Sequence, residues 1–139
     1  MTKEEELQGY LYAIEQYKEQ ISSLEMQFSY VQNAILDYSR AKITLENLNN
    51  SEKEVDLLFP IGGGTYVDAQ AKKTSTVLFD VGAGIVIEKP SEDAIKKIQV
   101  RIDDLQKTQE RIASMIQKIQ LEASELSERA QQLLNEDKK

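Results

Sequence analysis

The chain has 139 residues, of which 29% are charged and only 6% aromatic, and its formal net charge is −7. It contains no His and no Cys, which excludes disulfides, thiolate metal sites and the commonest general base and metal ligand. The acidic balance disfavours nucleic acid and anionic membranes as partners, because binding to either depends on Lys and Arg neutralising phosphates. We therefore expect a protein partner, no nucleic acid and no membrane.

The first residues, MTKEEE, are acidic where a secretory signal would be basic and then apolar. No stretch approaches the roughly 20 apolar residues that a membrane-spanning helix needs. The sequence is thus typical of a cytoplasmic protein.

The N-terminal part, residues 1–50, carries apolar residues at alternating steps of three and four. They occupy the positions Leu7, Tyr10, Ile14, Tyr17, Ile21, Leu24, Phe28, Val31, Ile35, Tyr38, Lys42 and Leu45, of which only Lys42 is polar. A period of 3.5 residues held for more than five heptads predicts a long coiled-coil helix. Thr2 followed by Glu5 predicts a capping box at its start.

The central part, residues 51–90, contains an internal repeat with an offset of 20 residues. LLFPIGGGTYV at 57–67 matches VLFDVGAGIVI at 77–87. In each copy a run rich in apolar and β-branched residues enters a Gly-x-Gly turn and leaves through a similar run, which predicts two β-hairpins. Such small hairpins bury little apolar surface, so we expect this part to be an oligomerisation module.

A phosphate-binding loop is the competing interpretation of Gly62-Gly63-Gly64. The sequence opposes it, because the sixth position of each glycine motif is Val67 or Ile87 and no Lys-Ser or Lys-Thr dipeptide follows. We expect no cofactor site and no metal site. Acidic runs such as Asp103-Asp104 are typical of the solvated face of a coiled coil, so the sequence predicts no catalytic residues and no enzyme.

The C-terminal part, residues 91–139, repeats the heptad pattern. Its seam positions are Ile95, Ile98, Ile102, Leu105, Gln109, Ile112, Ile116, Ile119, Ala123, Leu126, Ala130 and Leu133, of which Gln109 alone is polar. Ser91, after Pro90, is a candidate N-cap. If the two helices pair antiparallel with residue numbers adding to 140, every seam position meets another, and Tyr17 and Tyr10 face the small Ala123 and Ala130. The predicted fold is therefore mainly α: a long antiparallel coiled-coil hairpin with two β-hairpins inserted between its helices.

This arrangement resembles the alpha class of prefoldin subunits. The most specific resemblance lies in PIGGGTYV at 60–67 and VGAGIVIEK at 81–89, since two hairpin motifs are typical of the alpha class and one of the beta class. The resemblance implies a hexamer of two alpha and four beta subunits joined through their hairpins. It also implies an ATP-independent archaeal-type or eukaryotic chaperone that holds non-native proteins at the coiled-coil tips and passes them to a group II chaperonin.

Two sets of residues are candidates for these roles. Both termini fall at the end of the coiled coil remote from the hairpins, where the candidate client-binding residues are Leu7, Tyr10, Leu11, Ile14, Leu126, Leu133 and Leu134. Ordinary seam packing is the alternative for Leu7, Ile14 and Leu126, whereas Leu11 and Leu134 lie beside the seam. The candidate oligomerisation residues are Leu58, Phe59, Ile61, Tyr66, Val67, Leu78, Phe79, Val81, Ile85 and Ile87.

A second hypothesis is a structural coiled-coil spacer or filament-forming protein that assembles through its β module. It predicts one kind of subunit and no binding of unfolded protein. The sequence alone does not decide between a homo-oligomer and a hetero-oligomer, because the edge of a strand does not reveal which chain completes it.

Overall fold

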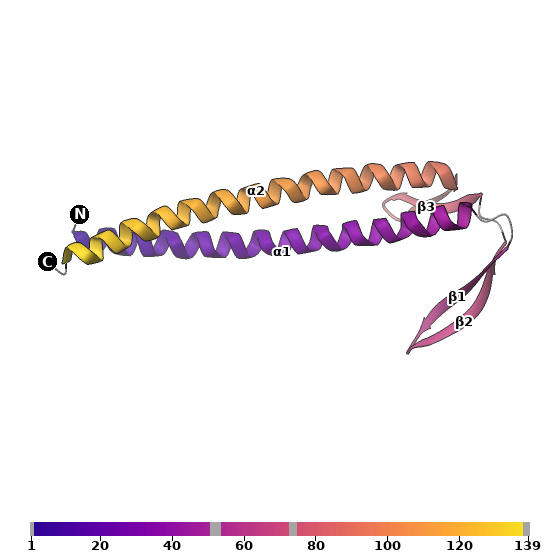
Figure 1. Ribbon diagram of the computed structural model, residues 1–139, viewed down its shortest axis with the longest axis horizontal. Coiled ribbons are helices and arrows are strands. Elements are labelled where there is room, and N and C mark those ends of the chain that lie inside the picture. The colour runs from indigo at the N-terminus through magenta and orange to yellow at the C-terminus, as the bar shows by residue number, and fades with distance from the viewer. Residues whose placement is uncertain (1, 51–53, 73–74, 138–139) are drawn as a thin grey trace. The chain divides into compact units, whose positions relative to one another are not determined.

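The computed structural model describes residues 2–50, 54–72 and 75–137. The elements, in order, are α1 (Lys3–Asn49), β1 (Val55–Gly62), β2 (Thr65–Ala71), β3 (Thr76–Gly82), β4 (Ile85–Pro90) and α2 (Ser91–Asp137) (Figure 1). Two helices of 47 residues each thus flank two β-hairpins, as the sequence predicts. The chain divides into two compact units, Met1–Ala34 with Leu105–Lys139 and Ile35–Asp104.

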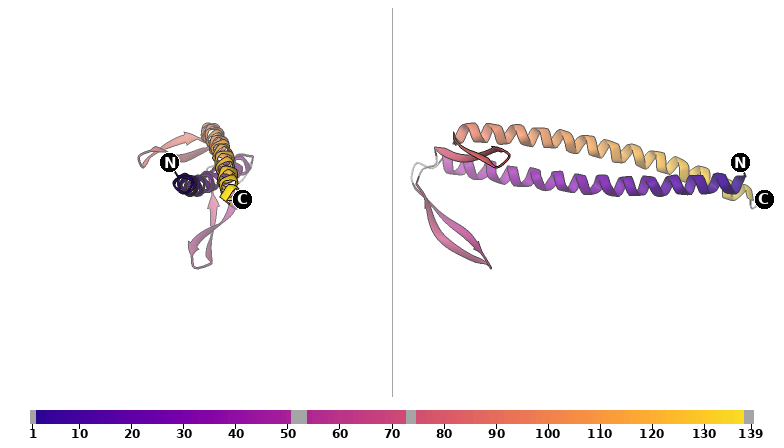
Figure 2. Two further views of the ribbon diagram at one scale, coloured as in Figure 1. Left: turned by 90° about the vertical axis from the view of Figure 1, so that its left-hand side faces the viewer. Right: turned by 180° about the vertical axis from the view of Figure 1, so that it is seen from behind.

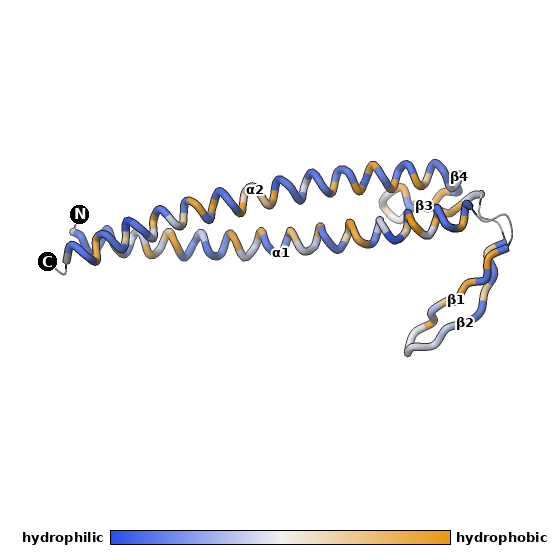
Figure 3. Tube along the Cα trace, viewed as in Figure 1, coloured by the Kyte–Doolittle hydropathy of each residue, from blue (hydrophilic) through white to orange (hydrophobic). Residues whose placement is uncertain are grey.

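In the first unit, the N-terminal part of α1 and the C-terminal part of α2 pair antiparallel. Hydrophobic residues recur at short intervals along both helices (Figure 3), and every seam position of this unit is buried or half-buried. Leu24, Val31, Ile112 and Ala130 are the most buried. The 3.5-residue period places these side chains along one stripe of each helix, so they cover one another and leave the charged residues in water.

Contacts between the two helices of the first unit confirm the predicted register. Tyr17 lies within interaction range of the Glu122 carboxylate, and the Gln109 side-chain amide donates to Gln32 Oε1. The residue numbers of the first pair add to 139 and those of the second pair to 141. Both sums lie within one of the 140 that the predicted register requires. Gln109 therefore satisfies its polar group beside Val31, the apolar residue that it faces in the seam.

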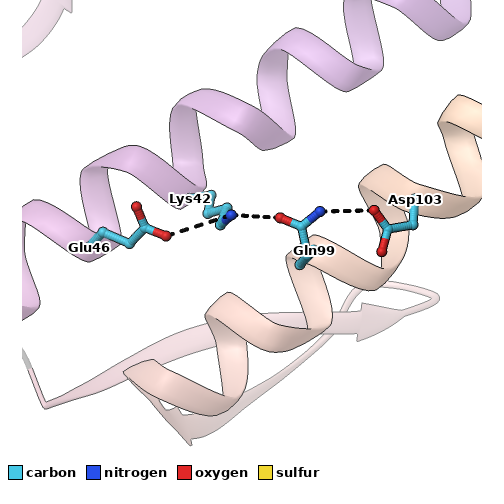
Figure 4. A network of polar contacts seen from close by, with 4 residues as sticks. All are labelled: Lys42, Glu46, Gln99 and Asp103. Atoms are coloured by element: carbon cyan, nitrogen blue, oxygen red, sulfur yellow. Dashed lines mark hydrogen bonds and ion pairs between the residues drawn. The ribbon is translucent and has the colours of Figure 1, made fainter.

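In the second unit, the C-terminal part of α1 pairs with the N-terminal part of α2 in the same register. Ile35, Ile98 and Ile102 are buried. Lys42 Nζ donates to Gln99 Oε1 at 2.6 Å and lies 3.7 Å from Glu46 Oε1 (Figure 4). Its aliphatic stem can remain in the seam while the charged group reaches polar partners at the edge, which is the snorkelling that long cationic side chains adopt.

The four strands form two separate antiparallel hairpins, β1 with β2 and β3 with β4. In both, a bulge precedes a two-residue turn, between Pro60 and Gly62 and between Asp80 and Gly82. The turn residues have positive φ, at 57° and 72° for Gly63-Gly64 and at 53° and 75° for Ala83-Gly84. Positive φ at both positions matches the right-handed twist of paired strands. The two predicted hairpins and their turns are therefore confirmed.

Candidate functional site

The first candidate site is the terminal end, which we define as residues 2–14 of α1 and its cap together with residues 126–136 of α2. Thr2 Oγ1 accepts a hydrogen bond of 3.2 Å from the Glu5 N–H, which is the N-cap half of the predicted capping box. Lys3 Nζ lies 3.4 Å from Glu136 Oε2. The beginning of α1 therefore lies next to the end of α2 (Figure 2).

Seam residues and flanking residues differ in exposure at this end. Leu7, Tyr10, Ile14, Leu126 and Leu133 are half-buried in the seam. Leu11 is 53% exposed and Leu134 is 47% exposed. Leu11 follows Tyr10 and Leu134 follows Leu133, so the two leucines hold the same heptad position on their helices. An antiparallel pair brings this position of both helices to the same flank.

Tyr12 is an exposed aromatic residue of the terminal end that the sequence analysis did not select. Its side chain is 69% exposed, on the outer face of α1 and away from the seam. The heptad pattern assigns such a position to solvent, so only its aromatic residue type could have drawn attention to it. It extends the apolar surface beyond Leu11.

The two seam tyrosines of the first unit, Tyr10 and Tyr17, interact with carboxylates. The Tyr10 hydroxyl donates to Glu6 Oε1 at 3.2 Å. The negative charge of Glu122, followed by burial and the hydrogen bond to the same carboxylate, raises the pKa of Tyr17 above its usual 10.0. Both seam tyrosines are half-buried and their hydroxyls have polar partners, as partly buried tyrosines normally do.

The second candidate site is the pair of hairpins. Nine of the ten residues selected there are exposed, namely Leu58, Phe59, Ile61, Tyr66, Val67, Leu78, Val81, Ile85 and Ile87. Phe79 is the exception, because only 9% of it is exposed. Leu57 and Val86 are also exposed and were not selected. Each hairpin thus presents apolar side chains beside strand edges that no other described strand pairs with, which is a common feature of interaction sites.

Within the described ranges 2–50, 54–72 and 75–137, no group of three or more Asp or Glu residues could hold a metal ion. Neither α1 nor α2 contains a window apolar enough to cross a membrane.

Comparison with known proteins identifies the family. A family model described as prefoldin subunit matches residues 17–136. The prefoldin subunit alpha of Methanococcus vannielii is 32% identical over 122 residues, which cover 88% of this chain and 82% of that protein. The chain belongs to the prefoldin family. It is a subunit of a prefoldin-type chaperone, similar to the alpha class.

Further relatives agree with this family. The prefoldin subunit alpha of Archaeoglobus fulgidus is 25% identical over 128 residues, which cover 92% of this chain and 93% of the relative. A cryo-EM structure of filamentous PFD from Methanocaldococcus jannaschii has a TM-score of 0.72 at 23% identity and covers 83% of this chain and 95% of that chain. At this identity the structural likeness supports the prefoldin fold alone.

Proposed function

We propose that this prefoldin subunit holds non-native proteins at its terminal end without ATP and passes them to a group II chaperonin in the cytoplasm. The observation that carries the proposal is the exposure of Leu11 and Leu134 on one flank of the paired helix ends. Exposed apolar side chains with few specific polar partners bind many different unfolded segments weakly. Tyr12 adds an amphipathic aromatic residue to the same end.

The hairpins are proposed as the oligomerisation module, which joins two alpha subunits with four beta-class subunits. Support comes from the exposed apolar residues on both hairpins and from the names of the relatives, each a subunit alpha. Two small hairpins with free edges gain stability by pairing with strands of other chains. The proposed division of the chain is therefore a coiled-coil helix at 1–50, the β module at 51–90 and a second coiled-coil helix at 91–139.

The terminal end can be tested with a double variant, Leu11→Ser with Leu134→Ser, assembled with a beta-class prefoldin subunit. We expect the variant to suppress client aggregation at least several-fold less well than the unsubstituted chain, because its two serine side chains offer no apolar surface to the client. Aggregation of a chemically unfolded client is followed by light scattering, and the molar mass of the assembly is measured on the same samples.

Leu121→Ser provides a matched control. Leu121 is 64% exposed and lies on α2, but outside the terminal end. This variant should suppress aggregation as the unsubstituted chain does. Equal losses in both variants would contradict a role for the terminal end, and no suppression by any assembled form would favour a structural spacer or filament.

A further inference from the structure

The two hairpins are similar in sequence but differ in the packing of one aromatic residue. Phe59 and Phe79 hold the same position in the repeat, and each pairs with the equivalent residue of the second strand, Val67 or Ile87. Phe79 is nevertheless 9% exposed, whereas Phe59 is 62% exposed. The repeated residues alone therefore do not account for the difference.

Arg101 of α2 connects the β3–β4 hairpin with both helices of the second unit. Its guanidinium lies 4.7 Å from the centre of the Phe79 ring and 5.7 Å from that of Tyr38 in α1. Arg101 Nη2 also donates to the Asp80 carbonyl oxygen at 3.2 Å. One side chain thus combines cation–π attraction to two rings with a charged hydrogen bond to the strand.

The beginning and the turn of the same hairpin are also tied down. The Ser91 N–H donates to the Ser75 carbonyl oxygen at 2.9 Å, which joins the residue before β3 to the first residue of α2. The Gly82 N–H donates to Asp80 Oδ1 at 2.8 Å and braces the bulge beside the turn. At the equivalent position of the repeat, Pro60 has no side-chain acceptor.

The contact between this hairpin and the helices is nevertheless small. Phe79 is the one buried residue within β3 and β4. The other long apolar side chains of the two strands are exposed, namely Leu78, Val81, Ile85, Val86 and Ile87. A hairpin of this size is marginally stable by itself, so we expect the loss of a single strong contact to change how often the hairpin lies against the helices.

We propose that Arg101 is a positioning residue for subunit assembly. It holds the β3–β4 hairpin against α1 and α2 in the unassembled chain, so that the hairpin meets a partner prefoldin subunit in one orientation. The β1–β2 hairpin, in which Phe59 is exposed, is oriented only in the complex. The partner therefore pairs with the β3–β4 hairpin first. The inference rests on the proposed assembly through the hairpins.

Positioning of this kind affects the rate of association rather than the lifetime of the complex. A hairpin that is already oriented loses less conformational entropy when it binds. If only a fraction of chains has the hairpin in place, the apparent affinity falls by that fraction. A side chain that itself touched the partner would act mainly on the dissociation rate.

Rate constants for binding to a beta-class prefoldin subunit test the inference on the full-length chain. Arg101→Gln should lower the association rate constant by about five-fold or more, because fewer chains have the hairpin in place, and should leave the dissociation rate constant nearly unchanged. Arg111→Gln is the matched control, since Arg111 is exposed on the same helix, and should change neither. An unchanged association rate in Arg101→Gln, or a loss seen only in dissociation, would overturn the positioning role.

Arg101→Lys separates positioning from attraction between charged subunits. Lysine keeps the positive charge but lacks the planar guanidinium that stacks on a ring while it donates to a carbonyl. This variant should associate as slowly as Arg101→Gln. Full recovery of the association rate with lysine would show that the charge attracts the partner and would contradict the positioning role.

A double variant tests whether Arg101 acts through Phe79. Phe79→Leu keeps an apolar side chain but removes the aromatic ring, so it should also slow association. Adding Arg101→Gln to it should slow association little further, because both substitutions remove the same contact. Effects that multiply would show that Arg101 acts elsewhere.

Hydrogen exchange of the isolated chain measures the hairpins before any partner binds. In Arg101→Gln the strand amides of β3 and β4 should exchange faster, and those of β1 and β2 should not change. Equal exchange of β3 and β4 in both chains would overturn the inference while leaving the assembly intact. Failure of the unsubstituted chain to form any complex, followed by light scattering, would instead remove the proposed assembly itself.

Discussion

Single polar residues in the seam are tolerated because each finds a polar partner at the edge of the helix pair. Lys42 reaches Gln99 and Glu46, and Gln99 in turn donates to Asp103 Oδ1 at 2.9 Å. Gln109 donates to Gln32. A buried polar group without a partner would cost about 1 to 3 kcal/mol, so these side chains also disfavour slipped registers in which their partners are out of reach.

A seam residue and an exposed residue of the same helix should respond differently to a new charge. Ile119→Asp should lower the free energy of unfolding by about 2 kcal/mol or more, because it places a carboxylate in the seam opposite an apolar side chain. Leu121→Asp, on the exposed face of α2, should change it by less than about 1 kcal/mol. Urea unfolding followed by circular dichroism measures both, and equal effects would contradict the register.

At the scale of the elements, the turn of the β3–β4 hairpin carries a strained residue that the β1–β2 hairpin avoids. Ala83 has a φ of 53°, and Gly63 has a φ of 57° at the same position of the repeat. A Cβ atom disfavours this left-handed conformation by about 1 kcal/mol. A Cβ built on Gly63 meets no heavy atom within 4 Å, so only the backbone conformation distinguishes the two turns.

Reciprocal substitutions should therefore have opposite effects. Ala83→Gly should stabilise the β3–β4 hairpin by up to about 1 kcal/mol, and Gly63→Ala should destabilise the β1–β2 hairpin by a similar amount. Hydrogen exchange of the strand amides reports each hairpin separately. Exchange that slows in the Gly63→Ala variant would show that the turn conformation does not limit hairpin stability.

Local sequence patterns were sufficient for the helices, the hairpins and the register. The heptad period and the 20-residue repeat can both be read directly from the order of residues along the chain. The register follows because Tyr17 and Tyr10 are matched by small residues in the opposite seam. The burial of Phe79 was not predictable in this way, since Phe59 has the same local sequence. The Arg101 guanidinium, which is distant in sequence, lies 4.7 Å from the centre of the Phe79 ring, and Arg101 lies beside the seam at a position normally assigned to solvent.

The candidate site was only partly predictable for a related reason. Leu11 and Leu134 could be selected because an apolar residue beside a seam is unusual. Tyr12 could not be selected in this way. The heptad pattern separates seam positions from surface positions, but it does not show which surface residues bind a partner. Leu57 of β1 was also not selected. Its exposure depends on what lies against the strand in the folded chain, which the local sequence does not show.

At the scale of the whole molecule, the proposed function depends on several terminal ends acting together. One terminal end exposes few apolar side chains, among them Leu11, Tyr12 and Leu134, and a contact of this size is weak. Several such ends joined through hairpins raise the effective concentration at which a client meets the next end.

The assembly should therefore hold clients far better than the isolated chain. At equal concentrations of terminal ends, we expect the complex with the beta-class subunit to bind a labelled unfolded client at least about 100-fold more tightly than the isolated alpha-type chain. Fluorescence anisotropy measures both affinities. Equal affinities would indicate that a single terminal end suffices and that assembly serves another purpose.

The proximity of Lys3 and Glu136 also determines how the first unit responds to mechanical force. A pull that separates the beginning of α1 from the end of α2 acts across the seam rather than along it. The layers of paired seam residues then separate one after another, beginning at the terminal end. Each step breaks only the contacts of one layer, so the helix pair yields to tension gradually where a sheared pair would have to break many layers at once.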